Sequence, residues 1–212
     1  MRADTKMLIL DAAQRLFAEH GYEATSLRAI IAAAGVNLAA VHYHFKSKEA
    51  LLLAVAERGI EPINRERMRM LLCAEQEAGG GPPQVEELIR AFIAPAFRVA
   101  TAPGEPLGST VFMRLMGRLY SESPEAAKLV FRSQLGEVAQ RFIKAFKRAL
   151  PYLTHDELMW RLHFLIGAMA HTFRGADLTE AVTGDLWRPA EPDVVLERLI
   201  RFLAAGMKAE VG

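Results

Sequence analysis

The chain has 212 residues, of which 51% are hydrophobic and 24% are charged, a composition that suits a globular protein of one or two domains. Its formal net charge of +1 gives no sign of a nucleic-acid-binding protein, so any such role must come from where the charges are placed. The single cysteine, Cys73, excludes a disulfide framework within the chain and favours a reducing cytoplasm, and no apolar run approaches the ~18–20 residues of a membrane span.

Residues 4–20 predict the first helix. Its apolar residues recur on one helical face, and they are Ile9, Ala13, Leu16 and Phe17. Gly21 follows as the stop signal, because glycine readily takes the left-handed conformation that ends a helix. We expect the apolar face to cover the two short helices that come next, since these cannot bury a core by themselves.

Residues 25–51 predict a helix, a tight turn, a short second helix and the start of a third. The first of these helices has apolar residues at spacings of three and four, namely Leu27, Ile30, Ile31 and Ala34. Thr25 or Ser26 can cap it, and Asn37 can cap the short helix 38–44. Gly35 stands where the chain must reverse, a position that favours positive φ. This is the layout of a helix-turn-helix, whose second helix enters the DNA major groove.

A resemblance to the TetR family of bacterial transcriptional regulators rests on Gly35-Val36-Asn37 and on Val41-His42-Tyr43-His44-Phe45-Lys46-Ser47-Lys48-Glu49-Ala50-Leu51. The family pattern is a Gly-Val turn, an aromatic-rich recognition helix ending in Phe, and a Ser/Asn-Lys-Glu-x-Leu opening of the fourth helix. His42 stands where the family usually has Tyr. Leu38, Ala39 and Ala40 are small or apolar where many relatives are polar. We therefore expect contacts to the DNA backbone to be kept and direct base readout to be thinner.

The candidate DNA contacts are Thr25, Ser26, Arg28, Asn37, Leu38, Ala39, Ala40, His42, Tyr43, His44 and Lys48. The resemblance implies that Tyr43 and Lys48 touch phosphates, and a phenol donor and an ammonium group beside a helix N-terminus suit that role. Core packing is the alternative for Tyr43, and an ion pair with Glu23 is the alternative for Arg28.

Helix capping is a second possible role for three members of this set. Capping alone would explain why Thr25, Ser26 and Asn37 carry side-chain oxygens. His42 and His44 are two residues apart on a helix and point to different sides, so they do not predict a metal site.

Beyond Ser47, a long fourth helix begins at Lys48, and Gly59 and Pro62 would kink it near the domain border. The basic stretch 65–69 alternates in charge and predicts a solvated helix face. Further helices are predicted in the regions 85–97, 107–120, 124–150, 155–173 and 194–207. We expect Pro95 to bend or end the first of these. The helix 155–173 is apolar most of the way round and must therefore be buried on most sides.

We therefore expect an all-α fold, with an N-terminal three-helix DNA-binding domain containing the helix-turn-helix over residues 1–50 and a C-terminal helical ligand-binding and dimerisation domain over residues 51–212. The C-terminal part resembles the TetR regulators that respond to fatty acids or acyl-CoA. The segments that carry this resemblance are Val111-Phe112-Met113-Arg114-Leu115-Met116-Gly117, Leu158-Met159-Trp160-Arg161-Leu162-His163-Phe164-Leu165-Ile166-Gly167-Ala168 and Phe202-Leu203-Ala204-Ala205-Gly206-Met207.

The same resemblance implies an apolar effector cavity, and flexible methionine and aromatic side chains suit one. The candidate lining residues are Phe92, Phe97, Phe112, Met113, Arg114, Met116, Arg118, Tyr120, Phe131, Phe142, Trp160 and Phe164. Plain core packing is the alternative for each. Arg114 and Arg118 lie four apart on one helix face and suit a carboxylate or phosphate, while solvation, or a pair of Arg118 with Glu122, is the alternative.

The predicted function is a ligand-responsive transcriptional regulator, most simply a repressor. It would act in the cytoplasm as a homodimer on a palindromic double-stranded DNA operator, and a small apolar effector such as a fatty acid or acyl-CoA would release it. The alternative is a helical lipid- or small-molecule-binding module without sequence-specific DNA activity. The sequence has no glycine-rich phosphate loop and no nucleophile elbow, so we expect no enzyme. We also expect no cofactor and no metal, and the lack of a long apolar run predicts no membrane partner. His163 and His171 are expected to be core or interface histidines.

Overall fold

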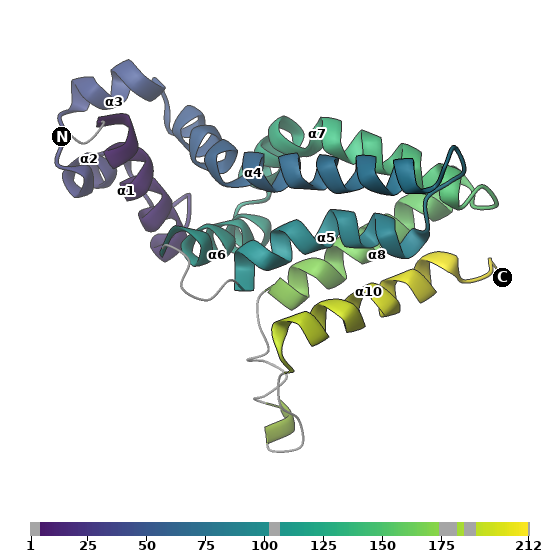
Figure 1. The fold of residues 1–212 in the computed structure, drawn as a ribbon. Coiled ribbons are helices and arrows are strands. Elements are labelled where there is room, and N and C mark those ends of the chain that lie inside the picture. The colour runs from purple at the N-terminus through teal and green to yellow at the C-terminus, as the bar shows by residue number, and fades with distance from the viewer. Residues whose placement is uncertain (1–4, 102–106, 174–181, 185–189, 212) are drawn as a thin grey trace. The chain divides into compact units, whose positions relative to one another are not determined.

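The computed structural model describes residues 5–101, 107–173, 182–184 and 190–211 (Figure 1). The helices with defined bounds are α1 (Thr5–His20), α2 (Leu27–Ala34), α3 (Leu38–Phe45), α4 (Lys48–Glu77), α5 (Val85–Thr101), α6 (Leu107–Glu122), α7 (Pro124–Ala149), α8 (His155–Phe173) and α10 (Pro192–Lys208). No strand occurs in these ranges, which confirms the predicted all-α fold. No helix in the described part of the chain is long and apolar enough to cross a membrane.

The chain forms two compact units. Unit 1 comprises Met1–Pro62 and Ala102–Gly136, and unit 2 comprises Ile63–Thr101 and Glu137–Gly212. The long helices α4 and α7 contribute to both. The predicted DNA-binding domain 1–50 lies wholly within unit 1, and its boundary at residue 50 stays a proposal.

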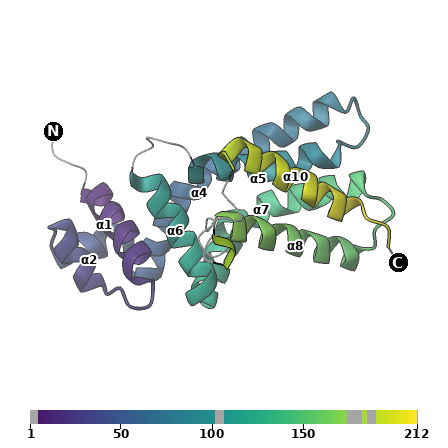
Figure 2. The same ribbon diagram turned by 90° about the horizontal axis from the view of Figure 1, so that it is seen from below.

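Unit 1 is built around α1. Ile9, Ala13 and Phe17 on its apolar face are fully buried, together with Ile30 of α2, and Phe45 of α3 is also buried. Helix α6 lies along α1, as both ribbon views show (Figures 1 and 2). The helix-turn-helix therefore rests on a packed support.

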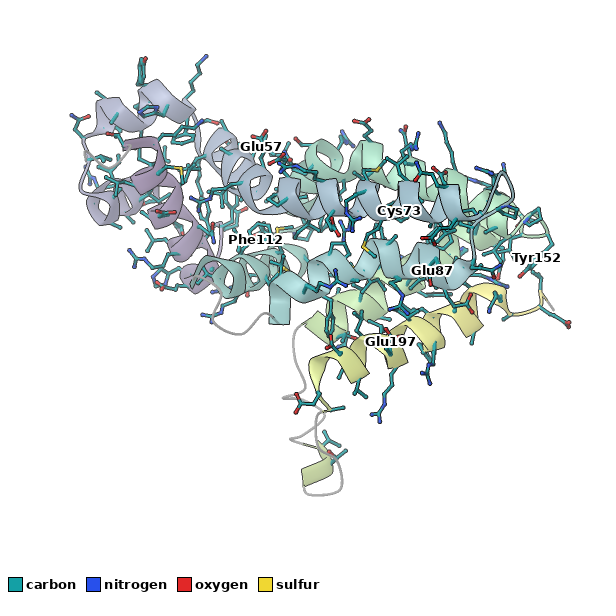
Figure 3. All side chains as sticks on the ribbon, in the orientation of Figure 1. Glu57, Cys73, Glu87, Phe112, Tyr152 and Glu197 are labelled. Atoms are coloured by element: carbon teal, nitrogen blue, oxygen red, sulfur yellow. The ribbon has the colours of Figure 1, made fainter. Side chains whose placement is uncertain are left out.

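Helix α4 touches α6 at a glycine. A Cβ atom at Gly59 would come within 2.3 Å of the ring of Phe112, so a side chain there would displace the ring. Phe112 is buried in this position (Figure 3). The assigned helix runs unbroken through Gly59 and Pro62, and α5 likewise continues through Pro95 to Thr101, so that helix does not end at its proline.

Unit 2 has a continuous apolar core that joins the second half of α4 to α5, α7, α8 and α10. Helix α10 packs against α5 and α8 (Figures 1 and 2). Its C-terminal end is fixed by the buried Arg161 of α8, which donates to the carbonyl oxygens of Met207 at 2.9 Å and Ala209 at 2.7 Å. Glu157, one turn away, accepts from Arg161 Nε at 2.7 Å and neutralises the buried charge.

The outward face of α8 and α10 is apolar and uncovered in the single chain. Trp160 is 59% exposed, Phe164 62% and Phe202 73%. A recess of about 420 Å³ lies between the two helices, and its lining includes Arg161, Phe164 and Phe202. The expectation that α8 is buried on most sides is therefore wrong for one copy of the chain, because α5 and α10 leave its outer face open. His163 and His171 are also exposed, so neither is a core histidine.

Candidate nucleic-acid interface and effector region

The turn between α2 and α3 has the local structure that the sequence predicted. Ser26 Oγ accepts from the N–H of Ala29 at 3.1 Å and caps α2, and Asn37 Oδ1 accepts from the N–H of Ala40 at 2.9 Å and caps α3. Gly35 ends α2 with φ at 64°. Because Gly35 and Asn37 both lie in the turn itself, the turn geometry is fixed locally.

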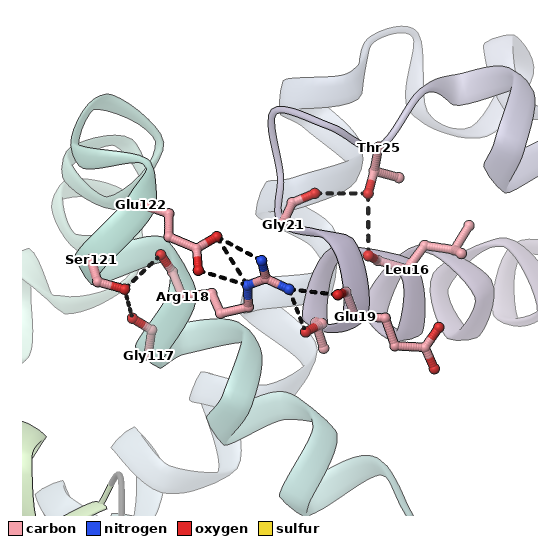
Figure 4. Close-up of polar contacts among 9 residues, drawn as sticks. Leu16, Glu19, Gly21, Thr25, Gly117, Arg118, Ser121 and Glu122 are labelled. Atoms are coloured by element: carbon pink, nitrogen blue, oxygen red, sulfur yellow. Dashed lines mark hydrogen bonds and ion pairs between the residues drawn. The ribbon is translucent and has the colours of Figure 1, made fainter. Parts of the chain in front are cut away.

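Thr25 has a different role from the one expected. Its side chain is buried, and Oγ1 donates to the carbonyl oxygens of Gly21 at 2.7 Å and Leu16 at 3.2 Å (Figure 4). The hydroxyl therefore ties the start of the helix-turn-helix to the end of α1. Ser26 is the cap in its place, and the Thr25 hydroxyl is used inside the protein.

Helix α3 has an inner and an outer face. Val41 and Phe45 are buried and hold the helix to the core. Tyr43 is 82% exposed, which rules out core packing for this ring. The other outward side chains of the candidate set are those of Leu38, Ala39 and His42, whereas Ala40 and His44 are half-buried. An exposed strip of this kind is what a recognition helix presents to a groove.

Lys48 is held in place by the turn that follows α1. Its Nζ donates to the carbonyl oxygen of Glu23 at 3.3 Å and lies 4.3 Å from the centre of the Tyr22 ring. Burial raises the pKa of Tyr22 to about 12, so this ring stays neutral. Arg28 is exposed, and the structure gives it no ion pair with Glu23 within the described residues. Lys48 is thus positioned beside the N-terminus of α4, where positive charge attracts phosphate.

The junction between α3 and α4 contains a strained residue that sequence reasoning missed. Lys46 has φ at 61° and ψ at −42°, and the N–H of Ser47 donates to the carbonyl oxygen of Phe45 at 2.6 Å. This is a γ-turn with positive φ, a rare conformation for a residue with a side chain. It redirects the chain within one residue, so that α4 starts immediately after the recognition helix.

The candidate effector residues are divided between the two units. Unit 1 holds Phe112, Met113, Arg114, Met116, Arg118, Tyr120 and Phe131, and unit 2 holds Phe92, Phe97, Phe142, Trp160 and Phe164. The expected cavity that joins them therefore stays a prediction. Some members already pack against one another: the ring centroids of Tyr120 and Phe131 lie 6.4 Å apart, and those of Phe92 and Phe142 lie 5.1 Å apart. Trp160 and Phe164 lie on the exposed face of α8.

The two arginines proposed for an anionic head group differ in their surroundings. Arg114 is exposed. Arg118 pairs with Glu122 at 2.9 Å, the alternative that the sequence left open, and also donates to the carbonyl oxygen of Glu19 at 2.6 Å (Figure 4). Its guanidinium group is therefore already occupied by protein acceptors.

Arg67 was predicted to lie on a solvated helix face, but the structure shows that it is buried. It is 4% exposed and lies on the inner stripe of α4, four residues from Ile63 and from Leu71. Its Nε donates to the carbonyl oxygen of Phe92 at 2.8 Å, and the guanidinium carbon lies 4.3 Å from the centre of the Phe92 ring. The four-residue spacing from two buried aliphatic residues was the signal that could have revealed it.

Comparison with known proteins supplies the family. Residues 9–55 match the family model for bacterial regulatory proteins of the tetR family, and residues 90–206 match that of the tetracyclin repressor-like C-terminal domain. The chain is 32% identical over 99 residues to the HTH-type transcriptional repressor ComR of Escherichia coli, covering 47% of this chain and 44% of that protein. It is 42% identical over 53 residues to the HTH-type transcriptional repressor Rv1474c of Mycobacterium tuberculosis, covering 25% and 28%. The matched part spans less than half the length of either relative.

Solved structures share the fold over nearly the whole chain. A putative fatty acid metabolism regulator of Clostridium perfringens is similar with a TM-score of 0.64 at 18% identity, covering 96% of this chain and all of that one. The fatty acid degradation regulator FadR of Bacillus halodurans gives 0.58 at 14% identity, covering 99% of this chain and all of that one. AmtR of Mycobacterium smegmatis gives 0.60 at 21% identity, covering 96% and 87%. Identities this low establish the fold alone.

Proposed function

Because this chain belongs to the TetR family of bacterial regulatory proteins, we propose that it is a DNA-binding transcriptional repressor. It acts as a homodimer on a palindromic operator and is released by a small effector. The observation that carries the proposal is the exposed strip of α3, where Tyr43 points outward while Val41 and Phe45 anchor the helix. The strip is thin in hydrogen-bonding groups, so we expect shape and phosphate contacts to contribute much of the affinity.

The uncovered face of α8 and α10 supports the homodimer. Trp160, Phe164 and Phe202 expose aromatic rings that in water favour contact with another apolar surface. A second copy would offer the same face, and a two-fold interface pairs identical patches. The two-fold axis then presents two α3 helices to half-sites about 34–36 Å apart, the spacing of successive major grooves.

Release by the effector follows from differential affinity. A ligand that binds more tightly to a conformation with a different separation of the recognition helices shifts the population away from the DNA-bound state. We propose an apolar effector, with a fatty acid or acyl-CoA as the leading class. Support comes from the methionine- and phenylalanine-rich segments of the C-terminal part and from the fold shared with two proteins named as fatty acid regulators.

Operator selection from random DNA tests the function directly. The purified full chain should enrich a palindrome, and fluorescence anisotropy on that sequence should show saturable binding that decanoate or decanoyl-CoA weakens. Tyr43→Ala serves as the matched loss-of-contact variant because its ring is exposed. If no sequence is enriched while acyl ligands still bind, the chain is a helical ligand-binding module and the repressor proposal is wrong.

A further inference from the structure

The guanidinium group of Arg67 is a buried charge without a counter-charge among the residues that the structure describes. Its acceptors in the described residues are the carbonyl oxygen of Phe92 and Asn64 Oδ1, at 3.2 Å, and both are neutral. Burial lowers the pKa of Arg67 to about 10, which still leaves the group protonated at pH 7. Burying an unpaired charge is costly, so native chains usually supply a partner.

The same unit shows what a structural buried arginine looks like. Arg161 is also buried, and the chain gives it the carboxylate of Glu157 in addition to carbonyl acceptors. Arg90 on α5 likewise pairs with Glu197 of α10 through both of its terminal nitrogens. Arg67 differs from both, since no carboxylate within the described ranges pairs with it.

The unused donors lie on one edge of the guanidinium group. Nε is taken by Phe92 and Nη1 by Asn64, whereas Nη2 donates to no described residue. The edge formed by the two terminal nitrogens matches the oxygens of a carboxylate or phosphate in a bidentate pair.

The guanidinium group lies against apolar side chains. Phe92 covers one face of the guanidinium group and packs edge-to-face against Phe142 at 5.1 Å. Met68 and Met70 of the same α4 helix pack against the core that contains Phe142. An oxyanion on an apolar body therefore suits Arg67 better than an inorganic anion does, because the body can pack against these aromatic and methionine side chains.

We propose that Arg67 anchors the oxyanion head group of the effector, with its apolar body against Phe92 and Phe142. This deepens the proposed function and rests on it, since it names the chemical class of the ligand that releases the repressor. It also moves the anion site away from Arg118, which protein acceptors occupy.

Calorimetry on the purified full chain with decanoate, decyl phosphate and decanol tests the proposal. All three are used below their critical micelle concentrations. The wild type should prefer one or both anions to decanol by roughly tenfold to hundredfold, the range expected for hydrogen bonds to charged groups. A preference for decanoate identifies a carboxylate as the head group, and a preference for decyl phosphate identifies a phosphate.

Variants at two neighbouring arginines locate the site. Arg67→Met should remove the preference for the anions and leave decanol binding unchanged, and Arg67→Lys should keep part of it. Arg69→Met is the matched control, because Arg69 is exposed and paired with Glu66, and it should keep the full preference. A wild type that does not favour either anion over decanol, including one that binds neither, overturns the proposal, as does an Arg67→Met variant that keeps the preference.

Thermal unfolding separates anchoring from a purely structural role. Removing an unpaired buried charge should leave the Tm of Arg67→Met equal to or above that of the wild type, and a large fall in Tm counts against the proposal. Operator binding without ligand is measured in parallel. Failure of the wild type to bind DNA would contradict the repressor function alone, because the anion preference is read without DNA.

Discussion

Arg118 Nη1 on α6 donates a 2.6 Å hydrogen bond to the carbonyl oxygen of Glu19 at the C-terminal end of α1 (Figure 4). The last carbonyl groups of a helix lack partners within the helix and carry a partial negative charge, so an arginine there is favourable. Glu122, one turn further along α6, holds the guanidinium group in place at 2.9 Å. The contact therefore fastens α6 to the helix that supports the helix-turn-helix.

Replacing Arg118 by Ala should lower the free energy of unfolding by about 1 kcal/mol. The change removes a charged donor from two carbonyl groups of α1 and from the Glu122 carboxylate, and the loss stays moderate because the site is partly open to water. Urea unfolding of the full chain measures the loss. Arg114→Ala is the control, since Arg114 lies on the same helix and is exposed. Equal unfolding midpoints for the two variants would show that the contact contributes little.

Local signals explain why the helix-turn-helix could be predicted from the sequence. Asn37, Gly35 and the apolar spacing of α2 act within a few residues of themselves, so the caps and the turn are visible without any tertiary information. Thr25 shows the limit of such local signals. Its hydroxyl has a partner nine residues away at Leu16, and no pattern in the sequence distinguishes that partner from a helix N-cap.

Tertiary packing explains the features that could not be predicted from the sequence. The charge alternation around Arg67 suggests a solvated face, whereas in the structure Arg67 is buried and donates to the carbonyl oxygen of Phe92 on α5. The apolar residues of α8 predict burial but do not say whether the chain itself or a second copy covers them, and Trp160 and Phe164 are uncovered in the single chain. The contact of Arg118 with Glu19 joins residues that are 99 positions apart.

Tyr43→Phe should weaken DNA binding to all sequences about equally, because a phosphate contact positions the protein without reading bases. A loss on the order of 1 kcal/mol is expected for one hydrogen bond. The Tm should not change, since the ring is 82% exposed. Anisotropy titrations against the selected operator and a scrambled sequence provide the comparison, and a loss confined to the operator would assign Tyr43 to base readout.

Lys48→Ala should reduce the steepness of the salt dependence of DNA binding by roughly one unit, the amount expected for one lost phosphate contact. Titrations at several salt concentrations give the slope. Lys128→Ala is the control, because Lys128 on α7 is exposed and pairs with Glu125. An unchanged slope for Lys48→Ala would mean that the contacts with Glu23 and Tyr22 are its whole role.

Acid should weaken the contact between α5 and α10. The hydrogen bond from Arg90 lowers the pKa of Glu197 below its ordinary value of 4.5 (Figure 3). A carboxyl group with a lowered pKa contributes its stability above the ordinary value and loses it as the pH falls through the lower, folded-state value. Glu197→Gln should therefore flatten the acid side of the stability profile below about pH 4.5, whereas Glu210→Gln, an exposed position, serves as the control. Urea unfolding at a series of pH values makes the comparison, and parallel profiles for the wild type and Glu197→Gln would contradict it.

Phe202→Glu should convert the proposed homodimer into a monomer that keeps its fold. The side chain is 73% exposed on α10 in the single chain, so a carboxylate there meets water in the monomer and would be forced against the partner's apolar face in the dimer. Sedimentation velocity reads the mass, and circular dichroism checks the helices. Leu72→Glu is the control, because Leu72 is an exposed apolar residue on α4. The monomer should also lose affinity for the palindrome while keeping weak binding to a single half-site, since each recognition helix is intact. A Phe202→Glu protein that sediments as a dimer would place the interface on another face of the chain.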